Sequence, residues 1–275
     1  MLKQRIITAL ILVPLVVLGV FKLPTTPWFA LLLAGVLLVG AWEWAALSGL
    51  KGWILRLLYV GFIALGLWLA AAVLRDAQTL YYFMLVALIW WGAVIGRLWR
   101  FTGRVRPEGF STVQALEGVV VLLPPWVALV GLHQVSGEGP AWVMFLLVLI
   151  WIADAGAYFT GRAWGRAKLA PRVSPGKTRE GAYGAMAGAL VLAIAVGLYA
   201  GFGAGRFFWF IVLCLVTTAM SIVGDLFESL VKRQRGVKDS GALLPGHGGM
   251  LDRIDSLTAA APVFLFGMLA GGFLR

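Results

Sequence analysis

Nine apolar stretches recur along the chain, and short polar segments separate each one from the next. A helix that crosses the hydrocarbon core of a bilayer needs about 20 predominantly apolar residues, and each stretch is close to that length. The stretches are residues 6–21, 28–48, 57–74, 80–97, 116–134, 140–163, 180–201, 207–231 and 257–273. This pattern predicts an all-α integral membrane protein, a polytopic bundle of about nine transmembrane helices.

The composition agrees with this prediction. Of the 275 residues, 61% are hydrophobic and 13% are charged, which is far more apolar than an ordinary soluble domain. The chain begins with basic residues and an apolar centre, as a secretory signal does, but no small-x-small cleavage pattern precedes Lys22. We therefore expect an uncleaved first span.

The basic residues are concentrated in alternate polar segments. If the N-terminus is cytoplasmic, all Lys and Arg residues fall in cytoplasmic segments except Lys22, Arg75, Arg206 and Arg275. This bias follows the positive-inside rule and predicts a cytoplasmic N-terminus. It also accounts for the formal net charge of +11 without a nucleic-acid partner. The three longer connections, 98–115, 164–179 and 232–256, lie on the same side, so we expect the chemistry to face the cytoplasm.

Residues capable of chemistry gather in the second half of the chain. We therefore distinguish the N-terminal transmembrane helices, residues 1–115, from a C-terminal transmembrane catalytic region, residues 116–275, within a single integral membrane unit. Pro124 and Pro125 fall inside one span and are expected to kink or break that helix. No internal repeat is evident, which weighs against a transporter built from inverted halves.

The polar segment from Ser229 to Ser256 carries the densest charge in the chain. Just before it, Asp225 lies four residues from Ser229, so on a helix the two side chains project from one face. Oxygen ligands in this arrangement can bind a hard divalent cation. The alternative is an ordinary pair between Glu228 and Lys232, which are also four residues apart at a helix end.

A glycine cluster follows, in which Gly246, Gly248 and Gly249 surround His247. Glycines let a backbone approach a ligand and direct its N–H groups at an anion. Asp252 could complete a metal site with Asp225, and four basic residues could hold phosphate oxygens. These four are Lys232, Arg233, Lys238 and Arg253. His247 could act as a general acid or base, donate to a phosphate, or order the loop through a hydrogen bond. A glycine-rich turn with a charged rim is the alternative.

A second cluster runs from Asp154 to Glu180 and is rich in basic residues between two spans. Its basic members are Arg162, Arg166, Lys168, Arg172, Lys177 and Arg179. The dipeptide Ser174-Pro175 indicates a turn. A basic segment beside a membrane is often only a topology signal or a lipid contact, which is the alternative interpretation.

Other polar and aromatic residues in the spans favour structural roles. We expect Glu43 and Glu117 to be buried, hydrogen-bonded acids rather than catalytic ones. The tryptophans, including Trp90, Trp91 and Trp99, suit aromatic belts at the two membrane interfaces. His133, at the outer end of its span, is expected to be interfacial and inert.

Two basic cytoplasmic segments, two acids able to share a metal and a glycine cluster together favour phosphoryl or nucleotidyl transfer to a lipid. The same residues resemble the phosphatidate cytidylyltransferase family, also called CDP-diacylglycerol synthase. The first part of the resemblance is carried by Ser229, Lys232-Arg233, Lys238-Asp239, His247-Gly248-Gly249, Asp252-Arg253 and Asp255. The second part is carried by Asp154, Ala157-Tyr158, Gly161-Arg162, Ser174-Pro175, Lys177-Thr178 and Glu180-Gly181. The N-terminal half matches only as a set of spans.

This resemblance implies condensation of CTP with phosphatidate, giving CDP-diacylglycerol and pyrophosphate, with Mg²⁺ and up to two metal ions. It implies metal ligation by Asp225, Ser229 and Asp252. We assign catalysis to Asp225, Asp252, Lys177, Lys232 and His247. The phosphates of either substrate are assigned to Arg162, Ser174, Lys177, Arg233, Lys238, Gly248, Gly249 and Arg253. A bacterial cytoplasmic (inner) membrane location, contact with membrane lipid and a possible homodimer complete the expectations.

The main rival is a secondary transporter or channel, because acids within membrane spans often mark ion paths. That reading predicts acids spread across the depth of the bilayer, whereas the dense group here lies at the cytoplasmic ends of spans. A CDP-alcohol phosphotransferase is disfavoured because its Asp-Gly-x-x-Ala-Arg pattern is absent.

Overall fold

Nine α-helices and one short β-hairpin make up the described part of the chain. The computed structural model describes residues 2–103, 105, 109–241, 243 and 248–274. The helices are α1 (Leu2–Lys22), α2 (Ala30–Leu47), α3 (Trp53–Ala70), α4 (Ala77–Arg100), α5 (Thr112–His133), α6 (Gly139–Trp164), α7 (Arg179–Tyr199), α8 (Ala204–Gln234) and α9 (Leu251–Ala270). Two short helical segments, η1 (Thr25–Phe29) and η2 (Ala71–Arg75), adjoin α2 and α3. The predicted bundle of about nine helices is confirmed.

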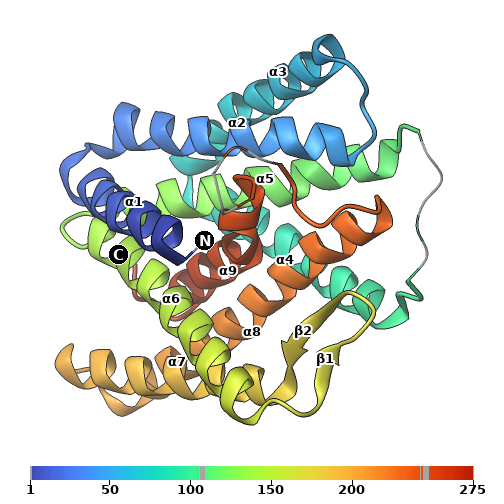
Figure 1. Cartoon of the computed structure of the whole chain (residues 1–275). Coiled ribbons are helices and arrows are strands. Elements are labelled where there is room, and N and C mark those ends of the chain that lie inside the picture. The colour runs from blue at the N-terminus through green and yellow to red at the C-terminus, as the bar shows by residue number, and fades with distance from the viewer. Residues whose placement is uncertain (1, 104, 106–108, 242, 244–247, 275) are drawn as a thin grey trace.

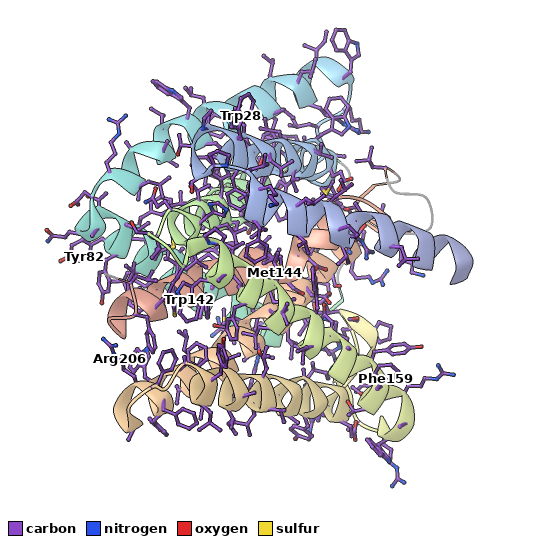
Figure 2. All side chains as sticks on the ribbon, turned by 90° about the vertical axis from the view of Figure 1, so that its left-hand side faces the viewer. Trp28, Tyr82, Trp142, Met144, Phe159 and Arg206 are labelled. Carbon is purple, nitrogen blue, oxygen red and sulfur yellow. The ribbon has the colours of Figure 1, made fainter. Side chains whose placement is uncertain are left out.

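Apolar length and an apolar outer surface mark the protein as an integral membrane protein. Eight of the described helices are long and apolar enough to cross a membrane, and α1 adds a shorter apolar segment at Leu12–Lys22. Figure 2 shows side chains projecting outward around the bundle, and among them Trp28, Tyr82 and Phe159 are more than half exposed. An exposed apolar surface of this extent is typical of a membrane-facing one.

The centre of the bundle is formed by α5 and α9 (Figure 1). Helix α9 packs against α8, α5 and α4, and α5 packs against α2, α3 and α6 as well. Of the candidate spans in the described part, α5 is the most buried. It runs as one helix through Pro124 and Pro125, so the expected break does not occur. In a bundle, groups on neighbouring helices can satisfy the carbonyl oxygens that lose a hydrogen-bond donor at a proline.

Aromatic side chains fill the core between α2, α4 and α8. Trp91 is fully buried, and its ring meets Phe227 of α8 edge-on, with centroids 5.8 Å apart. Trp44 of α2 also packs near Phe227, with the ring centroids 6.3 Å apart. The expectation that Trp91 belongs to an interfacial belt is therefore wrong, while Trp99 is largely exposed.

His133 is also buried, which contradicts its expected interfacial position. Its ring stacks on Phe29 with the centroids 3.8 Å apart. The Thr25 Oγ1 hydroxyl lies 2.7 Å from Nδ1, and Nε2 lies 2.8 Å from the Val20 carbonyl. If Nε2 carries the proton, both ring nitrogens are satisfied. His133 thus joins the end of α5 to the connection between α1 and α2.

The buried acid Glu117 has the structural role expected for it. It lies on α5 and forms an ion pair with Arg97 of α4. The Arg97 guanidinium also lies 5.4 Å from the ring centroid of Phe227. A carboxylate inside a bundle is tolerated when a charge or hydrogen-bond donors meet it. The pair therefore fixes α4 against α5.

Side-chain caps set where several helices begin. Asp76 caps α4, because its carboxylate accepts hydrogen bonds from the Thr79 N–H at 2.7 Å and the Thr79 hydroxyl at 2.6 Å. The hydroxyl and the N–H of Thr79 lower the pKa of Asp76 below its usual range. Thr178 caps α7 in the same way, accepting the Gly181 N–H at 3.1 Å.

The start of α9 differs from the sequence expectation. The apolar pattern placed the last span at 257–273, with a polar connection over 232–256, but α9 begins at Leu251 and α8 continues to Gln234. Asp252 and Asp255 therefore lie in the first turns of α9 rather than in a loop. A charged first turn does not contribute to the apolar signal from which the span was predicted.

Helices α6 and α7 approach each other closely at two glycines. A Cβ added at Gly156 of α6 would lie 2.6 Å from the Gly184 carbonyl oxygen, and one added at Gly184 would meet the Gly156 carbonyl at the same distance. Backbone atoms are in contact here, so any side chain would push the two helices apart.

We expect Gly156→Ala to destabilise the protein by about 1–3 kcal/mol because its methyl group overpacks this contact. The measurement is the midpoint of thermal unfolding in detergent. Gly92→Ala is the matched control, since nothing lies within 4 Å of a Cβ at this position in α4. An equal midpoint for the two variants would contradict the close approach.

Candidate active site

The hairpin between α6 and α7 brings a lysine to the end of α8. Its strands are β1 (Lys168–Ala170) and β2 (Ser174–Thr178), paired antiparallel, with Lys168 opposite Thr178. This pairing is the small β element that an all-α pattern did not predict. Ser174 begins a strand, so the turn falls at residues 171–173 and the expected Ser174-Pro175 turn is wrong.

Three contacts fix the hairpin against the helices. The Ala167 N–H donates to both carboxylate oxygens of Glu180, at 3.1 and 3.2 Å. The Arg179 N–H donates to the Ala167 carbonyl at 2.8 Å, which closes the base of the hairpin. Arg233 of α8 donates from Nε to the Val173 carbonyl at 3.3 Å, which holds its tip. The predicted phosphate ligand Arg233 thus has a structural contact here.

Lys177 and Asp225 form an ion pair across the gap between β2 and α8. Each side chain keeps about a quarter to a third of its surface exposed, at 27% and 29%. The Ser229 hydroxyl lies 3.4 Å from the Asp225 carboxylate, as their four-residue spacing predicted. The structure therefore joins the two charged clusters that the sequence showed separately.

A cavity of about 400 Å³ opens beside this pair. Asp154 and Arg162 of α6, Lys177 of β2 and Asp225 of α8 supply its charge. The rest of the wall comes from small or apolar residues and from Ser256: Ala153, Ala157, Leu169, Ala182, Ala185, Ile222 and Ser256 among them. A cavity with both a charged and an apolar wall can receive an ionic headgroup together with part of its apolar chain.

Two further acids belong to this group, and the sequence interpretation gave neither a role. Asp154 and Asp255 both interact electrostatically with Asp225 and with Lys177. Arg253, a predicted phosphate ligand, attracts Asp154 electrostatically, as Lys177 does. Asp154 and Asp255 each lie in one of the two motifs that carried the family resemblance, and their place in those motifs could have indicated a role at the site. Ser256 had no such signal.

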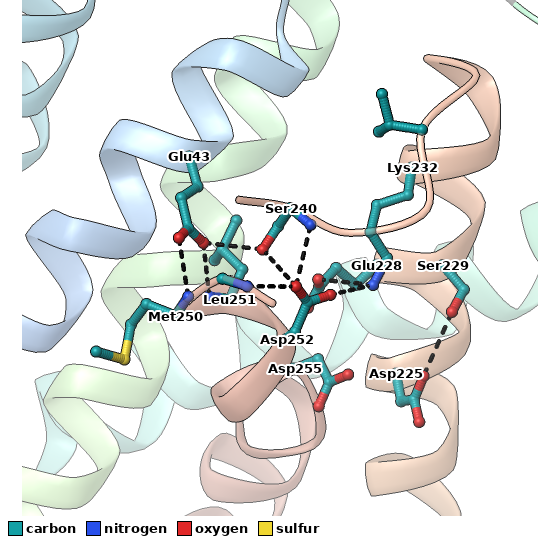
Figure 3. A network of polar contacts seen from close by, with 12 residues as sticks. Glu43, Asp225, Glu228, Ser229, Lys232, Ser240, Met250, Leu251, Asp252 and Asp255 are labelled. Atoms are coloured by element: carbon teal, nitrogen blue, oxygen red, sulfur yellow. Dashed lines mark hydrogen bonds and ion pairs between the residues drawn. The ribbon is translucent and has the colours of Figure 1, made fainter. Parts of the chain in front are cut away.

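A second charged group lies one to two helical turns beyond Asp225 on α8 (Figure 3). Lys232 forms ion pairs with Asp252 of α9 and with Glu228, whose carboxylate is 3.1 Å away. The alternative pair of Glu228 and Lys232 is therefore present, and Asp252 is added to it from another helix. All three side chains have 10% or less of their surface exposed. A lysine between two acids compensates the cost of burying their charge.

The glycines after α8 let the backbone meet Asp252. The Gly249 N–H donates to Asp252 Oδ2 at 2.8 Å. Gly248 has a positive φ of 79°, and a Cβ there would lie 2.6 Å from the same oxygen. Phosphate binding by Gly248 and Gly249 stays a prediction, because the contact seen here is with a protein carboxylate.

The remaining site predictions have different outcomes. Lys238 is exposed just beyond α8, and Arg162 is exposed at the cavity with its guanidinium 3.1 Å from the Tyr158 hydroxyl. Ser174 is half-buried in β2 and does not line the cavity. His247 lies outside the described residues, so its role stays a prediction.

A magnesium ion needs oxygen ligands, and the carboxylates and hydroxyls near the end of α8 are the candidates. Among the described residues, no three Asp, Glu, His or Cys side chains are grouped to hold a metal. Mg²⁺ is commonly bound through one or two carboxylates together with substrate phosphates. Asp225 and the Ser229 hydroxyl are oxygen donors of this kind, but Asp225 is paired with Lys177 in this geometry, so its metal role also stays a prediction. Asp252 is engaged by Lys232 and Gly249 in this geometry, and its metal role stays a prediction.

The whole chain is similar to proteins of a known family. The model of the cytidylyltransferase family matches residues 3–270. The phosphatidate cytidylyltransferase of Pseudomonas aeruginosa is 45% identical over 273 residues, covering 99% of both chains. That of Haemophilus influenzae is 38% identical over 285 residues, covering 97% of this chain and 98% of the relative. The Bacillus subtilis protein of the same name is 43% identical over 142 residues, about half of each chain. This membrane protein therefore belongs to the cytidylyltransferase family, as the resemblance of its C-terminal motifs predicted.

Proposed function

We propose that this protein is a phosphatidate cytidylyltransferase, which condenses CTP with phosphatidate to give CDP-diacylglycerol and pyrophosphate. Relatives with this name align with nearly the whole chain. The observation that carries the proposal is the cavity where Lys177 and Asp225 meet, since it has a charged wall and an apolar wall. The first suits a lipid phosphate and the second suits its glycerol and acyl attachment. Membership in this family also favours an enzyme over the rival transporter or channel.

The reaction needs positioning and charge compensation more than a covalent nucleophile. A phosphatidate oxygen forms a bond to the α-phosphorus of CTP, the bond from that phosphorus to the bridging oxygen of the β-phosphate breaks, and pyrophosphate leaves. Both substrates are polyanions that repel each other. Cationic groups at a site lower this repulsion, and they stabilise the charge that spreads over the transferring phosphoryl group.

The basic side chains at the cavity can supply this compensation. Lys177 and Arg162 line it, and Arg253 lies near enough to interact with Asp154 on its wall. Asp225 holds the Lys177 ammonium in place through their ion pair. Lys232 is instead held between Glu228 and Asp252, so we assign it the task of fixing Asp252 on α9.

Magnesium dependence forms part of the proposal. Asp225 and Ser229 would hold the ion at the end of α8, and Asp252 would join them if its contacts with Lys232 rearranged. The bound ion would offset negative charge on the substrate phosphates. Support comes from the oxygen donors gathered beside the cavity and from the family resemblance of these three positions.

We also propose a location in the bacterial cytoplasmic membrane with the site facing the cytoplasm. The concentration of Lys and Arg in alternate segments supports this orientation. CTP is water-soluble and would reach the site from that side, while phosphatidate would enter from the bilayer. A homodimer stays a prediction.

The purified protein, supplied with phosphatidate, Mg²⁺ and one nucleoside triphosphate at a time, is expected to form product with CTP. Lipid-linked nucleotide and released pyrophosphate are measured and should appear in equal amounts. Product from another nucleotide in preference to CTP, or no lipid-linked nucleotide at all, would contradict the proposed function.

Asp225→Asn is expected to lower kcat/KM by about 100-fold or more, because the amide removes charge from the proposed metal site and from the Lys177 pair. The variant should respond weakly to added Mg²⁺, whereas chelated wild-type protein should recover when Mg²⁺ is restored. Asp76→Asn is the control, since this exposed acid only caps α4 and asparagine caps equally well. Near-normal turnover by Asp225→Asn would remove the metal assignment.

Lys177→Ala is expected to lose at least about 100-fold in kcat/KM through lost charge compensation on phosphate. Lys168→Ala tests the same change on the neighbouring strand, where the side chain is exposed and lines no part of the cavity. Steady-state rates with CTP and phosphatidate distinguish the two. If both variants kept wild-type rates, the hairpin would be a topology signal only.

A further inference from the structure

Glu43 lies in the N-terminal helices but contacts the segment that carries the site. It is on α2 with 5% of its surface exposed. Its Oε1 accepts the Met250 N–H at 2.9 Å, and its Oε2 accepts the Leu251 N–H at 2.9 Å. These two N–H groups begin α9, where a carboxylate interacts favourably with the positive end of the helix dipole. Glu43 therefore holds the first turn of α9 from outside (Figure 3).

Ser240 extends this contact to Asp252. Its Oγ lies 2.8 Å from Glu43 Oε2 and 3.0 Å from Asp252 Oδ2, and its backbone N–H donates to Asp252 Oδ2 at 3.0 Å. One hydroxyl proton serves one of the two carboxylates at a time, while the N–H keeps Ser240 fixed on Asp252. Figure 3 shows Ser240 between Glu43 and Asp252, with Lys232 on the far side of Asp252.

Two glycines allow the carboxylate of Glu43 to lie this close to the backbone. A Cβ at Gly249 would be 2.4 Å from Glu43 Oε2, and a Cβ at Gly241 would be 2.6 Å from Oε1. A side chain at either position would displace the Glu43 carboxylate from the N–H groups that it accepts. The glycine cluster therefore serves Glu43 as well as Asp252.

Among the described residues, the hydrogen-bond partners of the Glu43 carboxylate are two backbone N–H groups and the Ser240 hydroxyl. A carboxylate offers two acceptor oxygens to the two N–H groups and the hydroxyl. A glutamine of the same size would offer one acceptor oxygen and one amide group that donates. One of its ends would therefore oppose a donor, and the register of Met250, Leu251 and Ser240 would shift.

We propose that Glu43 is a positioning residue for the transferase reaction, acting through Ser240 and the first turn of α9 to hold Asp252 in place. The inference rests on the proposed function and gives the N-terminal helices a part in it. Because Asp252 also holds Lys232, a displaced α9 terminus alters both charges at once. Small displacements of reacting or charge-compensating groups reduce the rate more than they reduce substrate binding.

Glu43→Gln tests this proposal, with Glu117→Gln as the matched control. Glu117 is also a buried acid, but it pairs with Arg97, and no hydrogen bond or ion pair joins it to the residues between 240 and 252 that the structure describes. We expect Glu43→Gln to lower kcat roughly 10- to 100-fold, with KM for CTP and phosphatidate changed by less than about threefold. Glu117→Gln should keep kcat per folded molecule near the wild-type value.

A merely structural role would lower the thermal midpoint of both variants and leave kcat per folded molecule unchanged. Equal kcat for Glu43→Gln and Glu117→Gln at the same folded fraction would overturn the proposal. If Glu43→Gln fails to fold, Ser240→Ala replaces it, since this variant removes only the bridging hydroxyl. A fall of about tenfold in its kcat supports the proposal, and a wild-type kcat overturns it.

Hydrogen exchange separates this inference from the proposed function. Glu43→Gln should speed exchange of the Ser240, Gly249, Met250 and Leu251 amides, while Glu117→Gln should not. Unchanged exchange at these amides in Glu43→Gln overturns the positioning role, whatever the wild-type protein synthesises. Absence of CDP-diacylglycerol from the wild-type reaction overturns the function instead.

Discussion

Burial of carboxylates in a bundle surrounded by lipid is the constraint on which the site depends. Each acid within the bundle needs a cation or several donors, because an uncompensated charge there costs several kcal/mol. Asp225 meets Lys177, Glu228 and Asp252 share Lys232, and Glu43 meets backbone N–H groups. Apart from the pair of Glu228 and Lys232, which both lie on α8, these contacts each join two elements, so charge compensation also determines how the elements are placed.

The hairpin and α9 both bring charged groups to α8. The hairpin supplies Lys177 to Asp225, and α9 supplies Asp252 to Lys232, which lies about two turns further along α8. Glycines at the helix contacts and in the segment before α9 permit these approaches, as at Gly156 and Gly249. The small residues of the chain are thus part of the electrostatic arrangement, since a larger residue would separate the charges that compensate each other.

Predictions from local pattern succeeded where one segment determines the outcome. The spans, the shared face of Asp225 and Ser229, and the pairing of Glu228 with Lys232 all follow from helical spacing within about one turn. Predictions failed where a residue's neighbours come from distant segments. Trp91 and His133 have interfacial side-chain chemistry, yet the packing of other helices around them leaves both buried. Sequence spacing carries no information about such neighbours.

The sequence by itself determined that this protein spans a membrane and that two charged segments face one side of it. Lipid imposes both properties on any chain, since every span needs about 20 apolar residues and basic segments stay on the cytoplasmic side. Only the tertiary structure decided that α9 begins at Leu251, that Lys177 meets Asp225, and that Glu43 contacts residues about 200 positions away. Partner choice depends on which helix ends meet in space, and many arrangements of nine helices satisfy the same apolar pattern.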